Sequence, residues 1–374
     1  MILNGQCLRL VDNSLKCINV NIDDIEKSIN EPFMAEPLKS QINDANNILF
    51  ITSPDISESV YEYFLKLCSG KKVHMAGFFI PEKYKEYEVV FNKSNANEYD
   101  FFGAAAGRAA MLVHKSIKDY DLIIVISSVI LNTFGGFLGS VSTLFTNITA
   151  DKTIMQVLKY ALQDIVSTGS FSKLFSGVTI RNPIYESMRE GLVTAGKAVH
   201  SFAVNIVSDY KHEDAIKHPV FSGDVFISQI EAQNVISSYY NKLKPATLYD
   251  GIKLNIKCYN NVIYMISLIE SACKMLLKGG RLLINIDDMK SFGNKTFQEC
   301  FYNNTLEEIV SSINEDNYME VFYSFILKYY TLNYHIALPF NEDLNDKLIQ
   351  AGLNPLKDDE YNNFLANCHN MVEL

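Results

Sequence analysis

The sequence predicts an α/β fold in which two α/β domains each contain a mainly parallel β-sheet. Apolar segments of strand length alternate with amphipathic segments of helix length along nearly the whole chain, and this alternation is typical of βαβ units. The chain has 374 residues, enough for two domains, and its 48% hydrophobic content excludes a disordered protein. Because Pro245 breaks the pattern, we expect an N-terminal domain over residues 1–244 and a C-terminal domain over 245–374.

The N-terminal domain is predicted to alternate strands with helices. We expect strands at Leu8–Val11, Lys16–Val20, Asn47–Thr52, Lys72–Phe79, Tyr87–Asn92, Asp121–Ser128 and Ser201–Ser208. We expect helices at Ser57–Cys68, Gly103–Lys118, Met155–Thr168, Asn182–Gly196 and Phe226–Lys242. Asn182 followed by Pro183 is typical of a helix start, with Asn as the N-cap and Pro in the first turn.

The C-terminal domain shows the same alternation. Its predicted strands are Lys253–Cys258, Arg281–Ile286 and Tyr334–Pro339. Its predicted helices are Val262–Leu277, Thr296–Ile313, Tyr318–Tyr330, Asp343–Ala351 and Asp359–Met371. For the last of these helices, Asp359–Met371, one possible position is against the N-terminal domain.

Charge and targeting signals narrow the class of protein. The net charge of −10 and the pI near 5.3 argue against a nucleic-acid binder, which needs a basic surface. The seven cysteines form no CxxC pair, which fits free thiols in a reducing compartment. Residues 122–150 carry no charge and could span a membrane, but their Ile- and Val-rich start and Gly135, Gly136 and Gly139 favour a buried strand and a loop. We therefore expect a cytoplasmic protein without a membrane segment.

Few local motifs indicate chemistry. The two common phosphate-binding loops, GxGxxG and GxxxxGK[ST], do not occur. The glycine-rich turn Gly135–Ser140 follows an apolar strand, where an α/β sheet often binds ligands, but a tight turn that packs closely is an equal alternative. His212 and His218 are the only close histidine pair, and their charged surroundings favour a solvated loop over a metal site. No GxSxG motif supports a catalytic triad.

Several segments together resemble a known family. The strongest is Tyr264–Phe301, with a helix, a Gly-Gly turn, a strand and a second small-residue turn in order. Phe101–Val125, Ser127–Ser140, Asn182–Val207 and the pair Gly223-Asp224 follow the same family in order along the chain. They resemble the nickel-dependent lactate racemases and their 2-hydroxyacid racemase-like relatives. The resemblance implies a lactate-racemase-like fold with a cleft between the two α/β domains.

The family's activity implies a nickel-pincer nucleotide tethered to a lysine, with histidines as metal ligand and acid–base groups. Racemisation can proceed by transfer of a hydride to the cofactor and back to either face of the substrate. That reaction needs a proton-accepting group on each side of the substrate, and histidine suits this role near neutral pH.

This sequence departs from the family at most positions that carry that chemistry. The family's histidines correspond here to Phe79, Asn132 and Leu158, and its cleft lysine corresponds to Leu268. Phenylalanine and leucine cannot bind nickel or transfer a proton, and asparagine is not a base. We therefore predict no metal site, and the catalytic residues stay undetermined.

The cofactor positions are also changed. Ser142 stands where the family has its cofactor lysine, and the Asp and Arg of an early phosphate-contacting turn fall near Ser53 and Ile56. Polar or small residues that could still contact a cofactor or ligand at the family's positions are Ser53, Asn132, Gly135, Gly136, Gly139, Ser142 and Tyr264.

Three hypotheses follow. We favour a divergent lactate-racemase-like protein, a pseudoenzyme without nickel-pincer chemistry that acts as a ligand-binding or regulatory relative, with a small molecule in the interdomain cleft. The first alternative is an isomerase, a racemase or epimerase of an unidentified 2-hydroxy acid with a rearranged cofactor site. The second alternative is a protein–protein scaffold in which apolar replacements fill the cleft.

Overall fold

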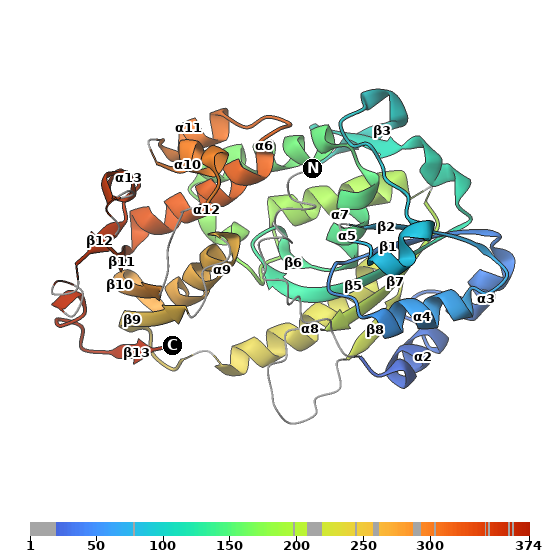
Figure 1. Cartoon of the computed structure of the whole chain (residues 1–374), viewed down its shortest axis with the longest axis horizontal. Coiled ribbons are helices and arrows are strands. Elements are labelled where there is room, and N and C mark those ends of the chain that lie inside the picture. Colours follow the sequence, from blue (N-terminus) through green and yellow to red (C-terminus); the bar gives the residue numbers. More distant parts are fainter. Residues whose placement is uncertain are drawn as a thin grey trace. The chain divides into compact units, whose positions relative to one another are not determined.

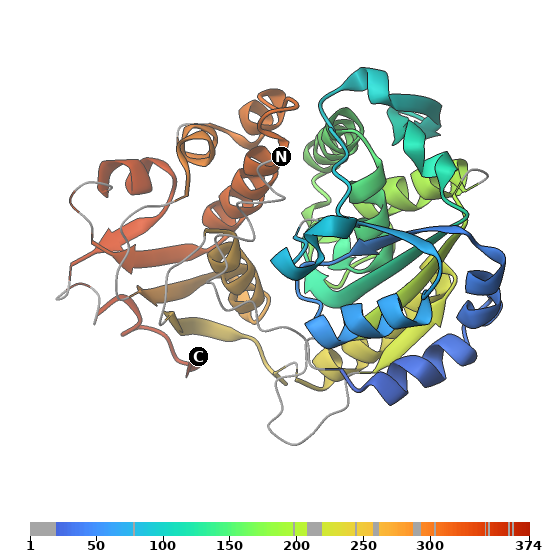
Figure 2. The ribbon, with the colours of Figure 1, turned by 45° about the vertical axis from the view of Figure 1, so that its right-hand side comes forward.

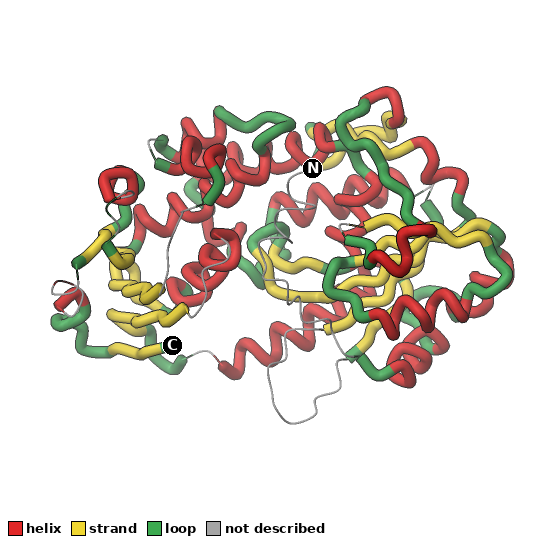
Figure 3. Tube along the Cα trace, viewed as in Figure 1, coloured by secondary structure: helices red, strands yellow, loops and turns green. Residues whose placement is uncertain are grey.

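The chain divides into two compact units in a computed structural model. The structure describes residues 20–77, 79–196, 199–207, 219–243, 245–256, 262–286, 293–302, 304–340, 342, 345–357, 360 and 363–374. Of these, 20–161 and 172–242 belong to the first unit, and 162–171 and 243–374 to the second. Both units are α/β (Figures 1 and 3). The predicted strands Leu8–Val11 and Lys16–Val20 lie outside the described residues, except for Val20, which is in no strand.

The first unit is built on a mainly parallel sheet with the strand order β2-β1-β5-β7-β8. The strands β1 (Asn47–Thr52), β2 (Lys72–Gly77), β5 (Leu122–Asn132) and β7 (Ser201–Val207) are parallel, and β8 (Val220–Gly223) is antiparallel to β7. The short strand β6 (Gly136–Leu138) folds back on the end of β5. Residues 122–129 are all buried, which explains why this part of β5 carries no charge and is mostly apolar.

Helices cover both faces of this sheet (Figure 2). One face packs with α2 (Ile22–Asn30), α3 (Leu38–Asp44) and α4 (Glu58–Leu67) around a core that includes Phe50, Ile124 and Phe202. The opposite face packs with α5 (Ser140–Ile148), and α5 in turn packs against α7 (Pro183–Ala195). The other helices among residues 20–243 are α6 (Asp151–Thr168), α8 (Val225–Leu243), η1 (Glu82–Tyr87), η2 (Ala96–Glu98), η3 (Lys115–Asp119) and η4 (Phe171–Leu174).

Two predictions for this unit are wrong. Residues 103–118 form a hairpin of β3 (Tyr99–Ala105) and β4 (Ala109–His114), followed by η3, and not a helix. The alanines favour a helix, but Ala106 and Gly107 take positive φ angles at the hairpin turn, and β4 buries alternate side chains. Tyr87–Asn92 is no strand either, because it makes a single bridge from Glu88 to Met75.

The uncharged segment 122–150 forms β5, the β5–β6 hairpin and α5. The interpretation as a buried strand and a loop is therefore correct, although α5 was not anticipated. Among the helices that the structure describes, none combines the length and apolar character needed to cross a membrane.

The second unit contains a five-stranded parallel sheet with the order β12-β11-β10-β9-β13. Its strands are β9 (Tyr249–Ile256), β10 (Leu276–Ile286), β11 (His335–Pro339), β12 (Asn354–Leu356) and β13 (Met371–Glu373). Its helices are α9 (Val262–Cys273), α10 (Lys295–Phe301), α11 (Leu306–Ser311), α12 (Tyr318–Asn333) and α13 (Asn345–Gln350). Helices α9 and α12 pack on each other and on the sheet, and Phe364 and Leu365 pack with Leu283 and Ala337.

Three predicted helices of this unit need correction. Thr296–Ile313 is two helices, because Thr305 and Glu308 form a capping box that starts α11. The helix predicted to reach Leu277 ends at Cys273, since Leu276 already pairs with Tyr249 in the sheet. The predicted helix Asp359–Met371 is too long: residues 360, 363 and 364 are helical, but turns follow from residue 365, and Met371–Glu373 pairs in parallel with β9 as an edge strand.

The architecture confirms the predicted α/β class with mainly parallel sheets. The exact domain boundary between residues 244 and 245 stays a prediction.

The predicted cap of α7 offers a stability test. Asn182 is fully buried; its Oδ1 accepts hydrogen bonds from the backbone N–H groups of Ile184 and Tyr185, and its Nδ2 donates to Val178 O. Asn182→Ala should lower the free energy of unfolding by about 1–2 kcal/mol, measured by urea denaturation. The matched control Asn92→Ala, at an exposed site, should change it by less than about 0.5 kcal/mol. Equal effects of the two substitutions would show that Asn182 does not cap the helix.

Candidate functional site

The candidate site lies where the chain leaves the carboxyl end of β5. In the sheet, β1 and β5 are neighbours. The chain leaves β1 toward β2 on one side and leaves β5 toward β7 on the other side, so the two connections run in opposite directions. Ligands of open α/β sheets bind outside the carboxyl ends of strands at such a point. Five of the residues singled out in the sequence lie at the end of β5 or in the turn, β6 and α5 that follow it: Asn132, Gly135, Gly136, Gly139 and Ser142.

The glycines of this turn are required by the protein's own packing. Gly135 and Gly136 have φ angles of +80° and +86°, a region that favours glycine. A Cβ on Gly136 would overlap the carbonyl of Val178, and a Cβ on Gly135 would lie 2.8 Å from Met188 Cε of α7. A Cβ on Gly139 would lie 2.7 Å from the Gln229 side chain of α8. The turn is therefore filled closely on three sides, and a ligand role for these glycines stays a prediction.

A buried polar network holds the turn against the sheet. Asn205, in the middle of β7, accepts hydrogen bonds at its Oδ1 from Ser127 Oγ (3.1 Å) and Ser140 N (3.0 Å). Its Nδ2 donates to Ser140 Oγ (3.0 Å) and Ser228 Oγ (2.9 Å). All four residues lie within a single buried cluster of β5, α5, β7 and α8. The sequence analysis missed this network, although an Asn inside the apolar strand SFAVNIV was its available signal.

The start of α5 is closed by side chains. Helix N-termini can bind anions because their first N–H groups lack partners. Here Ser140 N donates to Asn205, Val141 N donates to Gln229 Oε1 at 2.7 Å, and Gly139 N donates to Ser142 Oγ at 3.1 Å. Ser142 itself is 3% exposed, and its hydroxyl serves this cap. Three N–H groups at this helix start, those of Gly139, Ser140 and Val141, are therefore paired with side chains.

The polar groups at the two strand ends are also engaged. Asn132 Oδ1 accepts the backbone N–H of Phe134 at 2.7 Å. Ser53, directly after β1, donates its hydroxyl to Asp55 at 2.8 Å and accepts the N–H of Ser128 at 2.9 Å. Both side chains therefore stabilise the local turns. The hydrogen bond from Ser128 places Ser53 beside β5.

The remaining predicted positions are apolar or lie in the second unit. Phe79, which follows β2, is half exposed, whereas Leu158 on α6 is fully buried. Leu268 and Tyr264 lie on α9; Leu268 is partly buried, and the side chain of Tyr264 is outside what the structure describes. The pair His212 and His218 also falls outside the described residues.

The residues at the positions that the sequence resemblance assigns to the lactate racemases' chemistry do not fit a nickel-pincer nucleotide. No three side chains among His, Cys, Asp and Glu come close enough to hold a metal ion in the part of the chain that the structure describes. Ser142 offers no amine for a covalent link, and the buried Leu158 offers no ligand atom.

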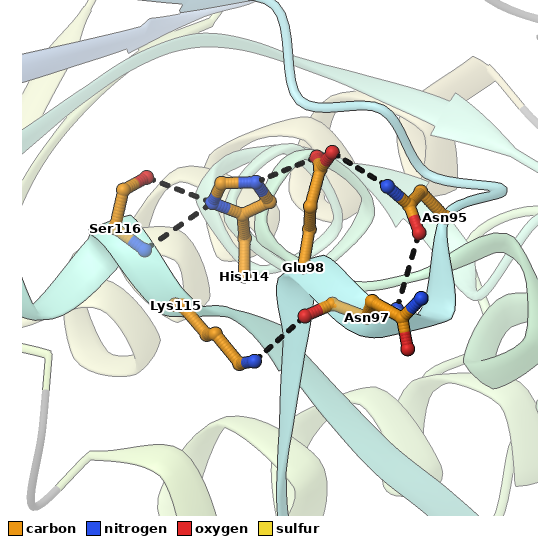
Figure 4. Close-up of polar contacts among 6 residues, drawn as sticks. All are labelled: Asn95, Asn97, Glu98, His114, Lys115 and Ser116. Atoms are coloured by element: carbon orange, nitrogen blue, oxygen red, sulfur yellow. Dashed lines mark hydrogen bonds and ion pairs between the residues drawn. The ribbon is translucent and has the colours of Figure 1, made fainter.

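His114 lies in a polar cluster elsewhere in the first unit (Figure 4). Its Nδ1 is 2.7 Å from Ser116 Oγ and accepts the N–H of Ser116, while its Nε2 is 3.4 Å from Glu98 Oε2. A serine, an imidazole and a carboxylate thus lie together, but the serine contacts Nδ1 and the carboxylate Nε2, the reverse of a hydrolase triad. The ring caps η3 through the Ser116 N–H and packs against Phe91 and, edge-on, against Tyr99. These contacts give His114 a structural role.

A cavity of about 380 Å³ opens at the other end of the first sheet, near the starts of β5 and β7. Its lining includes Glu36, Asp44, Asp121 and Asp224. Asp121 Oδ2 accepts the N–H groups of Asn46 and Asn47, which hold the pKa of its carboxyl below the usual value, and Asp224 caps the start of α8. Two of these carboxylates are thus structural.

Comparisons with known proteins identify the fold. A lactate racemase apoprotein from Thermoanaerobacterium thermosaccharolyticum superposes with a TM-score of 0.73 and 16% identity, over 94% of this chain and 90% of that one. A crystal structure of a Thermotoga maritima protein superposes with a TM-score of 0.60 and 13% identity, over 92% and 97% of the two chains. No family model and no curated protein matches the sequence. The chain therefore has a lactate-racemase-like fold.

Packing at the glycine turn can be separated from backbone strain. Gly136→Ala combines an unfavourable φ with overlap at Val178, whereas Gly107→Ala has a similar φ of +69° and no atom within 4 Å of the new Cβ. Gly107→Ala should cost about 1 kcal/mol of stability, and Gly136→Ala about 1–3 kcal/mol more. Urea unfolding of both variants measures the difference. Equal losses would mean that Val178 does not pack on the turn.

The polar network is testable through its central amide. Asn205→Leu removes the acceptor of Ser140 N and Ser127 Oγ and one donor each from Ser140 Oγ and Ser228 Oγ, so it should cost about 3 kcal/mol or more. Asn255→Leu, at an exposed position of β9, should cost less than about 1 kcal/mol. Denaturant unfolding, monitored by circular dichroism, compares the two variants with the parent chain. A loss at Asn205 as small as that at Asn255 would contradict the network's role.

Proposed function

We propose that this chain is a divergent lactate-racemase-like protein that does not carry out nickel-pincer racemisation and instead acts as a ligand-binding or regulatory relative. The observation that carries the proposal is the state of Ser142. This buried serine uses its hydroxyl to cap α5, and the sequence resemblance aligns it with the cofactor lysine of the lactate racemases. A cofactor that must be covalently held has no attachment group there.

The other replacements support the same proposal through the proton transfers that racemisation needs. A hydroxyl proton must be accepted on each side of the substrate. Asn132 is not a base, and its oxygen already accepts the Phe134 N–H. Leu158 is fully buried and Phe79 has no ionisable group. None of the three residues that the resemblance aligns with the family's histidines offers a base, which supports the proposal.

The alternative of a racemase would need other polar groups to hold the cofactor and to transfer protons. Of its candidates, Ser53, Asn132 and Ser142 each use their side chains in internal hydrogen bonds. A ligand would have to replace those bonds before any of the three could contact it, which lowers its affinity. The geometry therefore favours binding without this chemistry.

Loading with the family's cofactor tests the proposal directly. After incubation with the nickel-pincer nucleotide and desalting, the protein should retain no stoichiometric nickel and show no covalent mass increase. It should also leave the ratio of D- to L-lactate unchanged. An active lactate racemase treated in parallel is the positive control. A nickel-containing adduct would overturn the proposal, and stereochemical change without nickel would establish the alternative of an isomerase with a rearranged site.

A further inference from the structure

Two lysines of the second unit lie on neighbouring helical turns. Lys328 is on α12 and Lys347 is on α13. The Thr331 hydroxyl lies 3.0 Å from the carbonyl oxygen of Lys328 and 3.1 Å from that of Ala351. Ala351 N in turn donates to Lys347 O at 3.0 Å. These hydrogen bonds hold the turn of α12 that starts at Lys328 against the turn of α13 that starts at Lys347.

The two amines also lie over adjacent aromatic rings. Lys328 Nζ is 5.8 Å from the centre of the Phe301 ring, and Lys347 Nζ is 6.0 Å from the centre of the Tyr302 ring. The two rings, at the end of α10, have their centres 5.8 Å apart. The ring pair and the paired helical turns thus bring both ammonium groups to one place, where α10, α12 and α13 meet.

Lys328 is a nearly buried cation without a negative partner. It is 9% exposed, and burial lowers the pKa of its amine with no carboxylate opposing that effect. The ion pairs in the described part of the second unit use other lysines, namely Lys253, Lys274 and Lys295. A cation that is largely removed from water is destabilising unless a negative group compensates it. Lys328 therefore indicates an anion that is not part of the described chain.

A second polar group at the same place lacks a partner. Tyr302 is 4% exposed, and its buried hydroxyl has no hydrogen-bond partner among the described residues. Buried polar groups in native proteins are nearly always paired. Burial raises the pKa of this hydroxyl to about 12, so it stays protonated and can donate a hydrogen bond. A donor beside two lysines suits a ligand that is both negatively charged and a hydrogen-bond acceptor.

We propose that Lys328, Lys347 and Tyr302 bind a phosphate group. Near neutral pH a phosphate group carries close to two negative charges and several strong acceptor oxygens, which match two ammonium groups and one hydroxyl. The site lies wholly in the second unit, whereas the turn that the sequence resemblance assigns to phosphate contact, near Ser53 and Ile56, lies in the first. The inference therefore does not depend on the proposed function.

Binding of inorganic phosphate to three variants of the whole chain tests the site. Lys328→Met and Lys347→Met remove a charge but keep an unbranched apolar stem, and Tyr302→Phe removes only the hydroxyl. Isothermal titration with phosphate, at an ionic strength held constant with chloride, should give a Kd about tenfold higher or more in each variant than in the parent. This is the loss expected for a hydrogen bond that involves a charged group.

Lys357→Met is the matched control. Lys357 also lies over an aromatic ring of the second unit, 5.3 Å from the centre of Phe340, but it follows β12 and is on neither α12 nor α13. Its replacement should leave the Kd unchanged. Because Lys328→Met removes an uncompensated cation, this variant should melt at or above the temperature of the parent without phosphate, which shows that it folds. Phosphate should then raise the melting temperature of the parent more than that of the variant.

Titration with glycerol phosphate identifies the source of the phosphate group. Tighter binding than that of inorganic phosphate would support a phosphate monoester as the ligand, and the reverse order would support free phosphate. If the parent binds neither compound at millimolar concentration, or if all three variants bind phosphate as tightly as the parent does, the site is overturned. Nickel loading reports on the proposed function independently of either result.

Discussion

The arrangement of the first unit depends on one buried amide. Asn205 lies in a strand whose neighbours are apolar, and an unpaired amide there would be strongly destabilising. Its four hydrogen bonds reach Ser127 in the adjacent strand, Ser140 at the start of α5, and Ser228 on α8. Satisfying this single side chain therefore fixes the start of α5 and the position of α8 over the sheet. The turn between β5 and α5 has little freedom once both ends are held.

This constraint explains why fold and chemistry are separable in this chain. A glycine turn before a helix can hold a phosphate when the first N–H groups of the helix are open. Here Asn205, Gln229 and Ser142 occupy those groups, and Val178 packs on Gly136. The turn keeps the backbone shape that the fold needs, while the protein's own side chains pair with the N–H groups of Gly139, Ser140 and Val141. Likeness in fold to a lactate racemase therefore carries no activity with it.

The sequence predicted the buried parallel strands well because their signal is local. Residues 47–52, for example, form an uninterrupted apolar run, and β1 has the predicted bounds. Prediction failed where a local preference competed with tertiary contacts. The alanines of 103–118 favour a helix, but strand pairing between Tyr99–Ala105 and Ala109–His114 outweighs that preference. The polar network could not be predicted, because it joins residues up to 78 positions apart in the sequence.

Gln229 shows why an uncharged side chain closes this turn. A glutamate at this position could accept the Val141 N–H equally well, and its negative charge would suit a helix start. However, Gln229 is fully buried, and a carboxylate there would lose its hydration. Glutamine offers the same acceptor to α5 without burying a charge. The neutral amide therefore suits this position better than the acid, although both could accept the Val141 N–H.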